Sequence, residues 1–155
     1  MDVTIERVAY PTDEIRNLVA ELDRALAGPY RPEQRHALSF DQLFDESVLF
    51  VEARLGGTVV GCGGVAFDAG FAEVKRMFTR PEARRRGVAM AVLRHLETEA
   101  RSAGYSVLRL ETGIHQLEAL AFYERAGFER CAPFGDYRSL SPRAIETSVF
   151  FEKSI

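Results

Sequence analysis

The feature that most constrains the fold is a change of hydrophobic period near Arg84–Gly87. Before it, from Ser47 to Thr79, short apolar segments alternate with glycine turns, which is typical of an antiparallel meander. After it, apolar residues recur at helical spacing: Val88, Val92, Leu93 and Leu96. This change from strands to a helix within one domain predicts an α/β fold in the broad sense, with the mixed sheet of an α+β protein.

Elements of both kinds follow from the same patterns elsewhere. A first helix begins at the N-cap residue Thr12, carries its apolar face on Ile15–Leu26 and ends at Gly28-Pro29. A short helix over 33–38, a helix over 86–103 and a helix over 117–126 are also expected. The predicted strands are 3–9, 47–54, 58–67, 71–79, 106–110, 129–132 and 146–151, and 133–142 is a loop. Gly61, Gly63 and Gly64 predict a bulge or a close backbone approach within 58–67.

Bulk composition limits the possible functions. The 155 residues fit one domain over 1–155, and a net charge of −3 argues against a general nucleic-acid or anionic-membrane binder. Cys62 and Cys131 lack metal-ligand spacing, so no metal is expected, and both are interpreted as reduced residues. No signal peptide or membrane-length apolar run is seen, which predicts a cytoplasmic protein.

The turn Arg84-Arg85-Arg86-Gly87-Val88-Ala89 has the parts of an anion site. Free N–H groups and the dipole at a helix N-terminus attract negative charge, and a glycine lets an oxyanion approach the backbone. Arginines add directed donors, so phosphate or pyrophosphate is the best ligand. The spacing matches neither the GxxxxGK[ST] loop nor the GxGxxG fingerprint. A solvated helix start and a small nucleic-acid patch remain the alternatives.

With these residues, the sequence resembles the GNAT superfamily of acyl-CoA-dependent N-acetyltransferases. Arg84–Ala89 matches the family pattern [Q/R]-x-x-G-x-[G/A], with alanine at the last position. A second block, Leu120–Phe128, looks like the family's A-x-x-[LF]-Y-E-x-x-G-F and lies about 40 residues further on. The resemblance is specific over 47–128 and less diagnostic outside it.

The resemblance implies a mostly antiparallel central sheet, flanked by helices and splayed between its fourth and fifth strands, 71–79 and 106–110. Acetyl-CoA, the co-substrate, would lie in that split. The residues expected to bind it are Met77, Phe78, Thr79, Arg84, Arg85, Arg86, Gly87, Val88, Ala89, Met90, Gln116 and Tyr123. Gln116 stands where many members have an asparagine.

The implied reaction is direct attack of a primary amine on the thioester, within a ternary complex. A carboxylate would take the proton of the amine. Glu73, four residues before Met77, has the position of the base in some histone-type members, and Glu111 is the competing candidate. Tyr123 fits the general acid that protonates the thiolate. His115 is a weaker candidate base, and Cys62 a weaker nucleophile.

Three questions stay open at the level of sequence. The acceptor would contact 28–44 and 133–142, where arginines and aromatics suit a carboxylate or a flat ring, while Asp136 suits a cationic amine. A non-catalytic acyl-CoA sensor on the same fold is the alternative function. A homodimer is possible.

Overall fold

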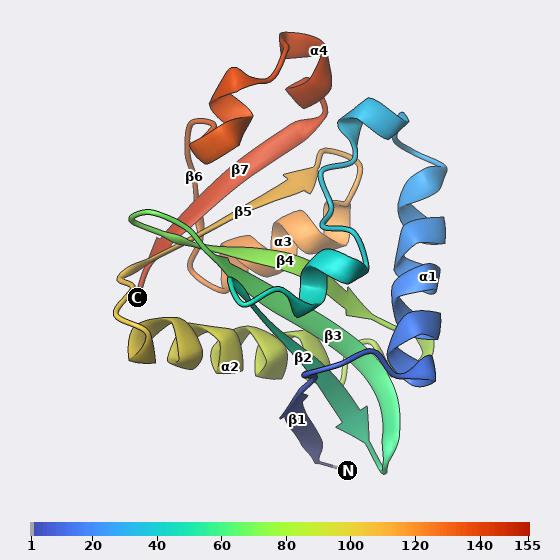
Figure 1. Cartoon of the computed structure of the whole chain (residues 1–155). Helices are drawn as coiled ribbons and strands as arrows, with labels where there is room; N and C mark the ends of the chain where they lie inside the picture. Colours follow the sequence, from blue (N-terminus) through green and yellow to red (C-terminus); the bar gives the residue numbers. More distant parts are fainter. Residues whose placement is uncertain (1) are drawn as a thin grey trace.

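A computed structural model describes residues 2–155 as one mixed sheet with helices packed on it (Figure 1). The seven strands lie in the order β1-β2-β3-β4-β5-β7-β6. Their bounds are β1 Val3–Arg7, β2 Val48–Leu55, β3 Thr58–Phe67, β4 Ala72–Thr79, β5 Val107–Gly113, β6 Glu129–Arg130 and β7 Ser148–Ser154. The helices are α1 Asp13–Ala27, α2 Val88–Ser102, α3 Leu117–Arg125 and α4 Pro142–Ile145. The predicted α/β class and the Thr12 cap, which accepts from the Ile15 N–H, are confirmed.

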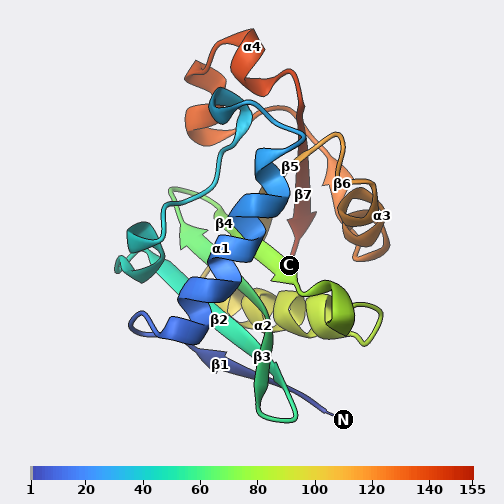
Figure 2. The ribbon, with the colours of Figure 1, turned by 90° about the vertical axis from the view of Figure 1, so that its right-hand side faces the viewer.

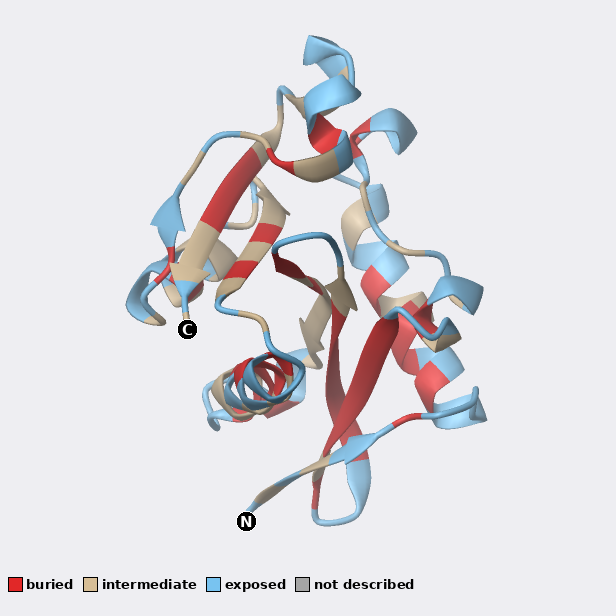
Figure 3. Cartoon of the chain, turned by 60° about the vertical axis from the view of Figure 1, so that its left-hand side comes forward, coloured by how far each residue is buried: buried red, intermediate tan, exposed pale blue. Residues whose placement is uncertain are grey.

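Successive side chains along each strand point to opposite faces of the sheet, and both faces are apolar. Val59 packs with Ile15 and Leu18 of α1, whereas its neighbour Val60 belongs to the core that contains Val92 of α2. The two helices therefore cover opposite faces of the meander (Figure 2). Figure 3 shows buried residues concentrated in the central strands and on the inner sides of both helices.

Close approach and a bulge explain the glycines of β3. A Cβ on Gly63 would lie 2.6 Å from both Met77 Sδ and Val92 Cγ1, so α2 and β4 could not pack as they do. The β3–β4 register also shifts between Cys62 and Gly64, opposite Arg76, whose φ is +57°. The predicted close approach is present at Gly63, whereas this bulge lies on the neighbouring strand β4, where it turns Arg76 toward the α1 face.

The sheet opens between β4 and β5. These strands are parallel and pair only at Ala72–Leu108 and Glu73–Arg109, after which they diverge. β5 remains paired with β7 from Val107 to Gly113. The predicted splay is confirmed, and it leaves the β4 backbone from Val74 onward without a strand partner on that side.

Two segments differ from expectation because tertiary bonds use their backbone. The helix predicted over 33–38 is a 3₁₀ turn at Pro32–Gln34 only. Beyond it, the carbonyls of His36 and Leu38 accept bonds from the side chains of Lys75 and Arg76. The predicted loop 133–142 holds a 3₁₀ turn at Gly135–Ser139 and the start of α4, which Ser141 caps.

The strand ends also move by a few residues, and β6 is shorter than 129–132. Within 2–155, no helix has the length and apolar character needed to cross a bilayer. Over the same residues, no group of three or more metal-ligating side chains comes together.

Candidate active site

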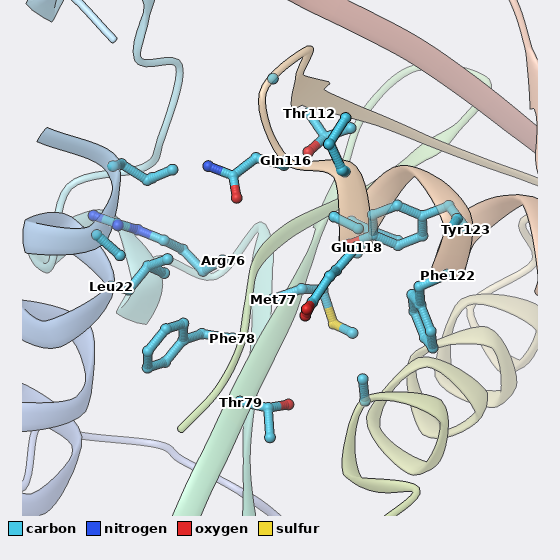
Figure 4. A pocket seen from close by; sticks show the side chains of 18 of the residues that line it. Leu22, Arg76, Met77, Phe78, Thr79, Thr112, Gln116, Glu118, Phe122 and Tyr123 are labelled. Carbon is cyan, nitrogen blue, oxygen red and sulfur yellow. The ribbon is translucent and has the colours of Figure 1, made fainter. Parts of the chain in front are cut away.

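A cavity of about 1100 Å³ lies where β4 and β5 part (Figure 4). Its walls come from the end of α1 and the loop after it, β4, the turn before α2, the end of β5, and α3. Segments from both halves of the chain therefore meet at the opening of the sheet. Every residue of the predicted site lines this cavity except Arg86 and Glu73.

The turn before α2 forms one end of this cavity. Gly87 is the N-cap with φ +80°, a conformation that favours glycine, and it offers no capping side chain. The N–H groups of Val88, Ala89 and Met90 thus lack helical acceptors. A Cβ at Gly87 would meet no atom within 4 Å, so the turn faces open space that an anion can enter.

The arginines of this turn are not equivalent. Arg84 and Arg85 line the cavity, and Arg84 Nε donates to Thr79 O at 3.2 Å. Arg85 has a φ of +63°, which sharpens the turn. Arg86 is exposed and lies outside the cavity wall. Its predicted contact with a phosphate group therefore has less support than those of its two neighbours.

The β4 wall includes a residue that the sequence did not single out. Met77, Phe78 and Thr79 line the cavity as expected, and so does Arg76. Arg76 donates to Asp23 at 2.6 Å and to Leu38 O at 2.9 Å. Only the glycines of the partner strand β3 hinted at this bulge. Cys62 donates its Sγ proton to Arg76 O, and burial raises the pKa of the thiol to about 12, so it is no thiolate nucleophile.

Tyr123 reaches the cavity from α3. The residue is 6% exposed, and its ring packs against Phe122, Phe128 and Phe151. Burial raises the pKa of the phenol above its usual range, so the hydroxyl keeps its proton at neutral pH. The ring points into the cavity beside Met77 in Figure 4. The position suits a proton donor.

The two candidate carboxylates lie in different surroundings. Glu111 lines the cavity at the end of β5, and burial raises its pKa, while Ser148 Oγ donates to Oε2 at 2.6 Å. Glu73 lines a smaller neighbouring cavity of about 350 Å³. Its Oε2 accepts from Tyr137 at 2.7 Å and pairs with Lys75 at 3.1 Å. Glu111 therefore has the better access to the split between the strands.

The loop after β5 completes the wall. Gln116 is the N-cap of α3, and its side chain points into the cavity (Figure 4). The backbone N–H of His115 donates to Tyr30 Oη at 3.0 Å, and the two rings lie 5.5 Å apart. Tyr30 therefore joins the loop after α1 to this edge. His36 contacts Ala144 O through Nε2 at 2.8 Å.

Comparison with known proteins agrees with this geometry. The Acetyltransferase (GNAT) family matches residues 13–128. An IAA acetyltransferase of Azospirillum brasilense is 42% identical over 99% of both chains. A solved structure from Klebsiella pneumoniae, attributed to the acyl-CoA N-acyltransferases, is 33% identical with a TM-score of 0.76, covering 98% of this chain and 97% of that one. The PaiA N-acetyltransferase of Thermoplasma acidophilum, solved with coenzyme A, has a TM-score of 0.75 at 20% identity and covers 100% of both chains. The chain belongs to the GNAT family of acetyltransferases.

Proposed function

We propose that this chain transfers the acetyl group of acetyl-CoA to a primary amine, with both substrates bound together. The observation that carries the proposal is the opening of the sheet after Glu73–Arg109 into a cavity. This cavity holds a helix N-terminus suited to an anion, Tyr123 and Glu111. Such a layout lets an amine meet a thioester directly, so proximity supplies much of the acceleration.

The residues around the cavity fit acetyl-CoA. The backbone amides at 88–90, with Arg84 and Arg85, suit the pyrophosphate. The free edge of β4 at Met77–Thr79 suits the amides of the pantetheine arm, which would add to the sheet as a strand does. Gln116 can reach the same arm with its amide. Proteins of the same fold solved with coenzyme A and with acetyl-CoA support this donor.

Acid–base roles are proposed for two side chains. Glu111 takes the proton of the attacking amine, since its carboxylate lies in the cavity and its raised pKa makes it a stronger base. Tyr123 gives its proton to the departing thiolate. Glu73, already bonded to Tyr137 and Lys75, instead holds the segments around the smaller cavity. Acetyl-CoA supplies only the activated acetyl group.

The most informative experiment is a thiol-release assay with acetyl-CoA over a panel of amines, amino acids and peptides. The panel also includes IAA, because the relative that is 42% identical to this chain is named an IAA acetyltransferase. We expect thiol release with at least one amine, and a matching acetylated product by mass spectrometry. If acetyl-CoA raises the melting temperature while every acceptor fails, the chain is an acyl-CoA sensor and the catalytic proposal is wrong. The predicted homodimer and cytoplasmic location stay predictions.

A further inference from the structure

Glu111 is held from one side only. Its Oε2 accepts from Ser148 Oγ at 2.6 Å, a short, charge-assisted bond. No hydrogen bond to Oε1 is found among the described residues, and that atom is not among the buried polar atoms left without a partner. Oε1 is therefore accessible, on a residue that lines the cavity.

The register of β5 and β7 explains how Ser148 reaches this carboxylate. Glu111 lies opposite Phe150, and Ser148 lies two residues before Phe150, opposite Gly113. Ser148 is thus the diagonal neighbour of Glu111 on the same face of the sheet. Because Gly113 has no side chain, nothing on β5 stands between the hydroxyl and the carboxylate.

The other charged groups around Glu111 have partners of their own. Lys75 on β4 pairs with Glu73 at 3.1 Å and donates to His36 O and to Tyr137 Oη. The loop residue His36 is bound to Ala144 O through Nε2. Lys75 and His36 favour the ionised form of Glu111, Glu73 opposes it, and Tyr30 also faces it. Ser148 is the hydrogen-bond donor found on the carboxylate itself.

We propose that Ser148 is a positioning residue, which binds Oε2 of Glu111 so that Oε1 is presented to the amine of the acceptor. In the reaction, the ammonium proton moves from the nitrogen of the acceptor to Oε1, and the nitrogen lone pair is freed for attack. Ser148 does not touch either substrate. This inference rests on the proposed function, because it assigns a helper to the base of that reaction.

The test compares Ser148→Ala, Ser148→Thr and wild type by the pH profile of kcat/KM. The substrate is the panel amine with the highest rate. Because the same amine is used for every variant, its own ionisation contributes equally to each profile and drops out of the comparison. The hydroxyl stabilises the carboxylate, so its loss raises the pKa of Glu111 and moves the acid limb to higher pH. We expect about a 3- to 10-fold lower kcat/KM on the acid limb of Ser148→Ala, equivalent to a shift of about 0.5 to 1 pKa unit. Ser148→Thr keeps the hydroxyl and should restore the wild-type limb.

A second measurement reads the same pair without substrates. The pKa of Glu111 is followed by ¹³C NMR of side-chain carboxyls in the free protein, with Glu111→Gln to assign the signal. It should rise in Ser148→Ala and stay unchanged in Ser154→Ala, an exposed serine at the other end of β7.

The outcomes separate the two proposals. Wild-type turnover with identical profiles in Ser148→Ala overturns the role of Ser148 and leaves the acetyltransferase proposal standing. A shifted profile that Ser148→Thr does not restore also counts against it, because the hydroxyl is then not the cause. If wild type acetylates no amine, the proposed function and this inference fall together.

Discussion

At the residue scale, burial keeps Tyr123 in the protonated state that its proposed role as a proton donor requires. Aromatic neighbours exclude water from the ring, and no charged group stabilises the phenolate. The phenol therefore holds its proton throughout the neutral range and loses it only to a strong base. The departing sulfur gains negative charge as the thioester breaks, and a phenol that has kept its proton can donate a hydrogen bond, or the proton itself, to that sulfur.

Tyr123→Phe tests this role. We expect kcat to fall by about 100-fold, since the general acid is lost, while the Kd of acetyl-CoA changes little because the ring remains. Kinetics and calorimetry measure the two quantities. Tyr10→Phe, at an exposed tyrosine, is the control. An unchanged kcat would assign Tyr123 to packing alone.

The same raised pKa gives a prediction for the pH profile of wild type. Because Tyr123 must be protonated and its pKa lies above the usual range, kcat should show no alkaline decline below about pH 10. We expect the acid limb to follow the ionisation of Glu111, the proposed base. A stopped assay of acetylated product across pH 6–10, at saturating substrates, measures this, and a decline near pH 8 would argue against a buried phenol as the acid.

At the scale of elements, the N-terminus of α2 gives the cavity the features that an anion site needs. Its N-cap is a glycine in the left-handed region, which leaves three backbone N–H groups uncovered. The open space beside Gly87 is where a side chain would intrude. The sequence predicted this from the glycine and its flanking arginines, because both the helix start and its charge are local properties.

Gly87→Glu should therefore abolish acetyl-CoA binding, with Kd raised beyond about 100-fold, because it places a carboxylate against the phosphates. Gly104→Glu is the matched control. Gly104 has φ +92° and open space too, but lies at the opposite end of α2. Both variants bear comparable backbone strain, about 1 kcal/mol, so only a loss specific to Gly87 supports the site. Equal affinity of the two by calorimetry would contradict it.

At the scale of the whole molecule, the cavity depends on a contact between distant parts of the chain. Tyr30, in the loop after α1, fills the space that a Cβ of Gly113 on β5 would take, and its hydroxyl accepts from the His115 N–H. This contact fixes the N-terminal loop over the opening of the sheet. Neither residue belongs to a motif that the sequence alone reveals.

A double-mutant cycle measures that contact. Gly113→Ala should lower the free energy of unfolding by about 2 kcal/mol, because its methyl overlaps the Tyr30 ring. In the Tyr30→Ala background, the same change should cost much less, which gives a coupling of about 1 kcal/mol or more in urea unfolding. Additive effects would mean that the cost of the methyl does not come from the Tyr30 ring.

The sequence by itself determined the α/β class, the strand order of the meander, the glycine turn that begins α2 and the place of Tyr123 on α3. These follow from local periods, turn glycines and short motifs, since each depends on residues close together in the chain. It favoured Glu73 as the base and kept Glu111 as the competing candidate, without showing which of them reaches the cleft. It also expected a helix at 33–38, where the structure has a single 3₁₀ turn.

Only the tertiary structure decided which carboxylate opens into the cavity. Glu73 meets Tyr137, 64 positions away, and Glu111 meets Ser148, 37 positions away. Such partners depend on the register of β7 against β5 and on the packing of the turn at 135–139. The bulge at Arg76 has the same origin, because close packing of α2 on Gly61 and Gly63 sets the path of the neighbouring strand. Local sequence patterns record backbone preference, whereas these contacts arise when distant segments share one sheet.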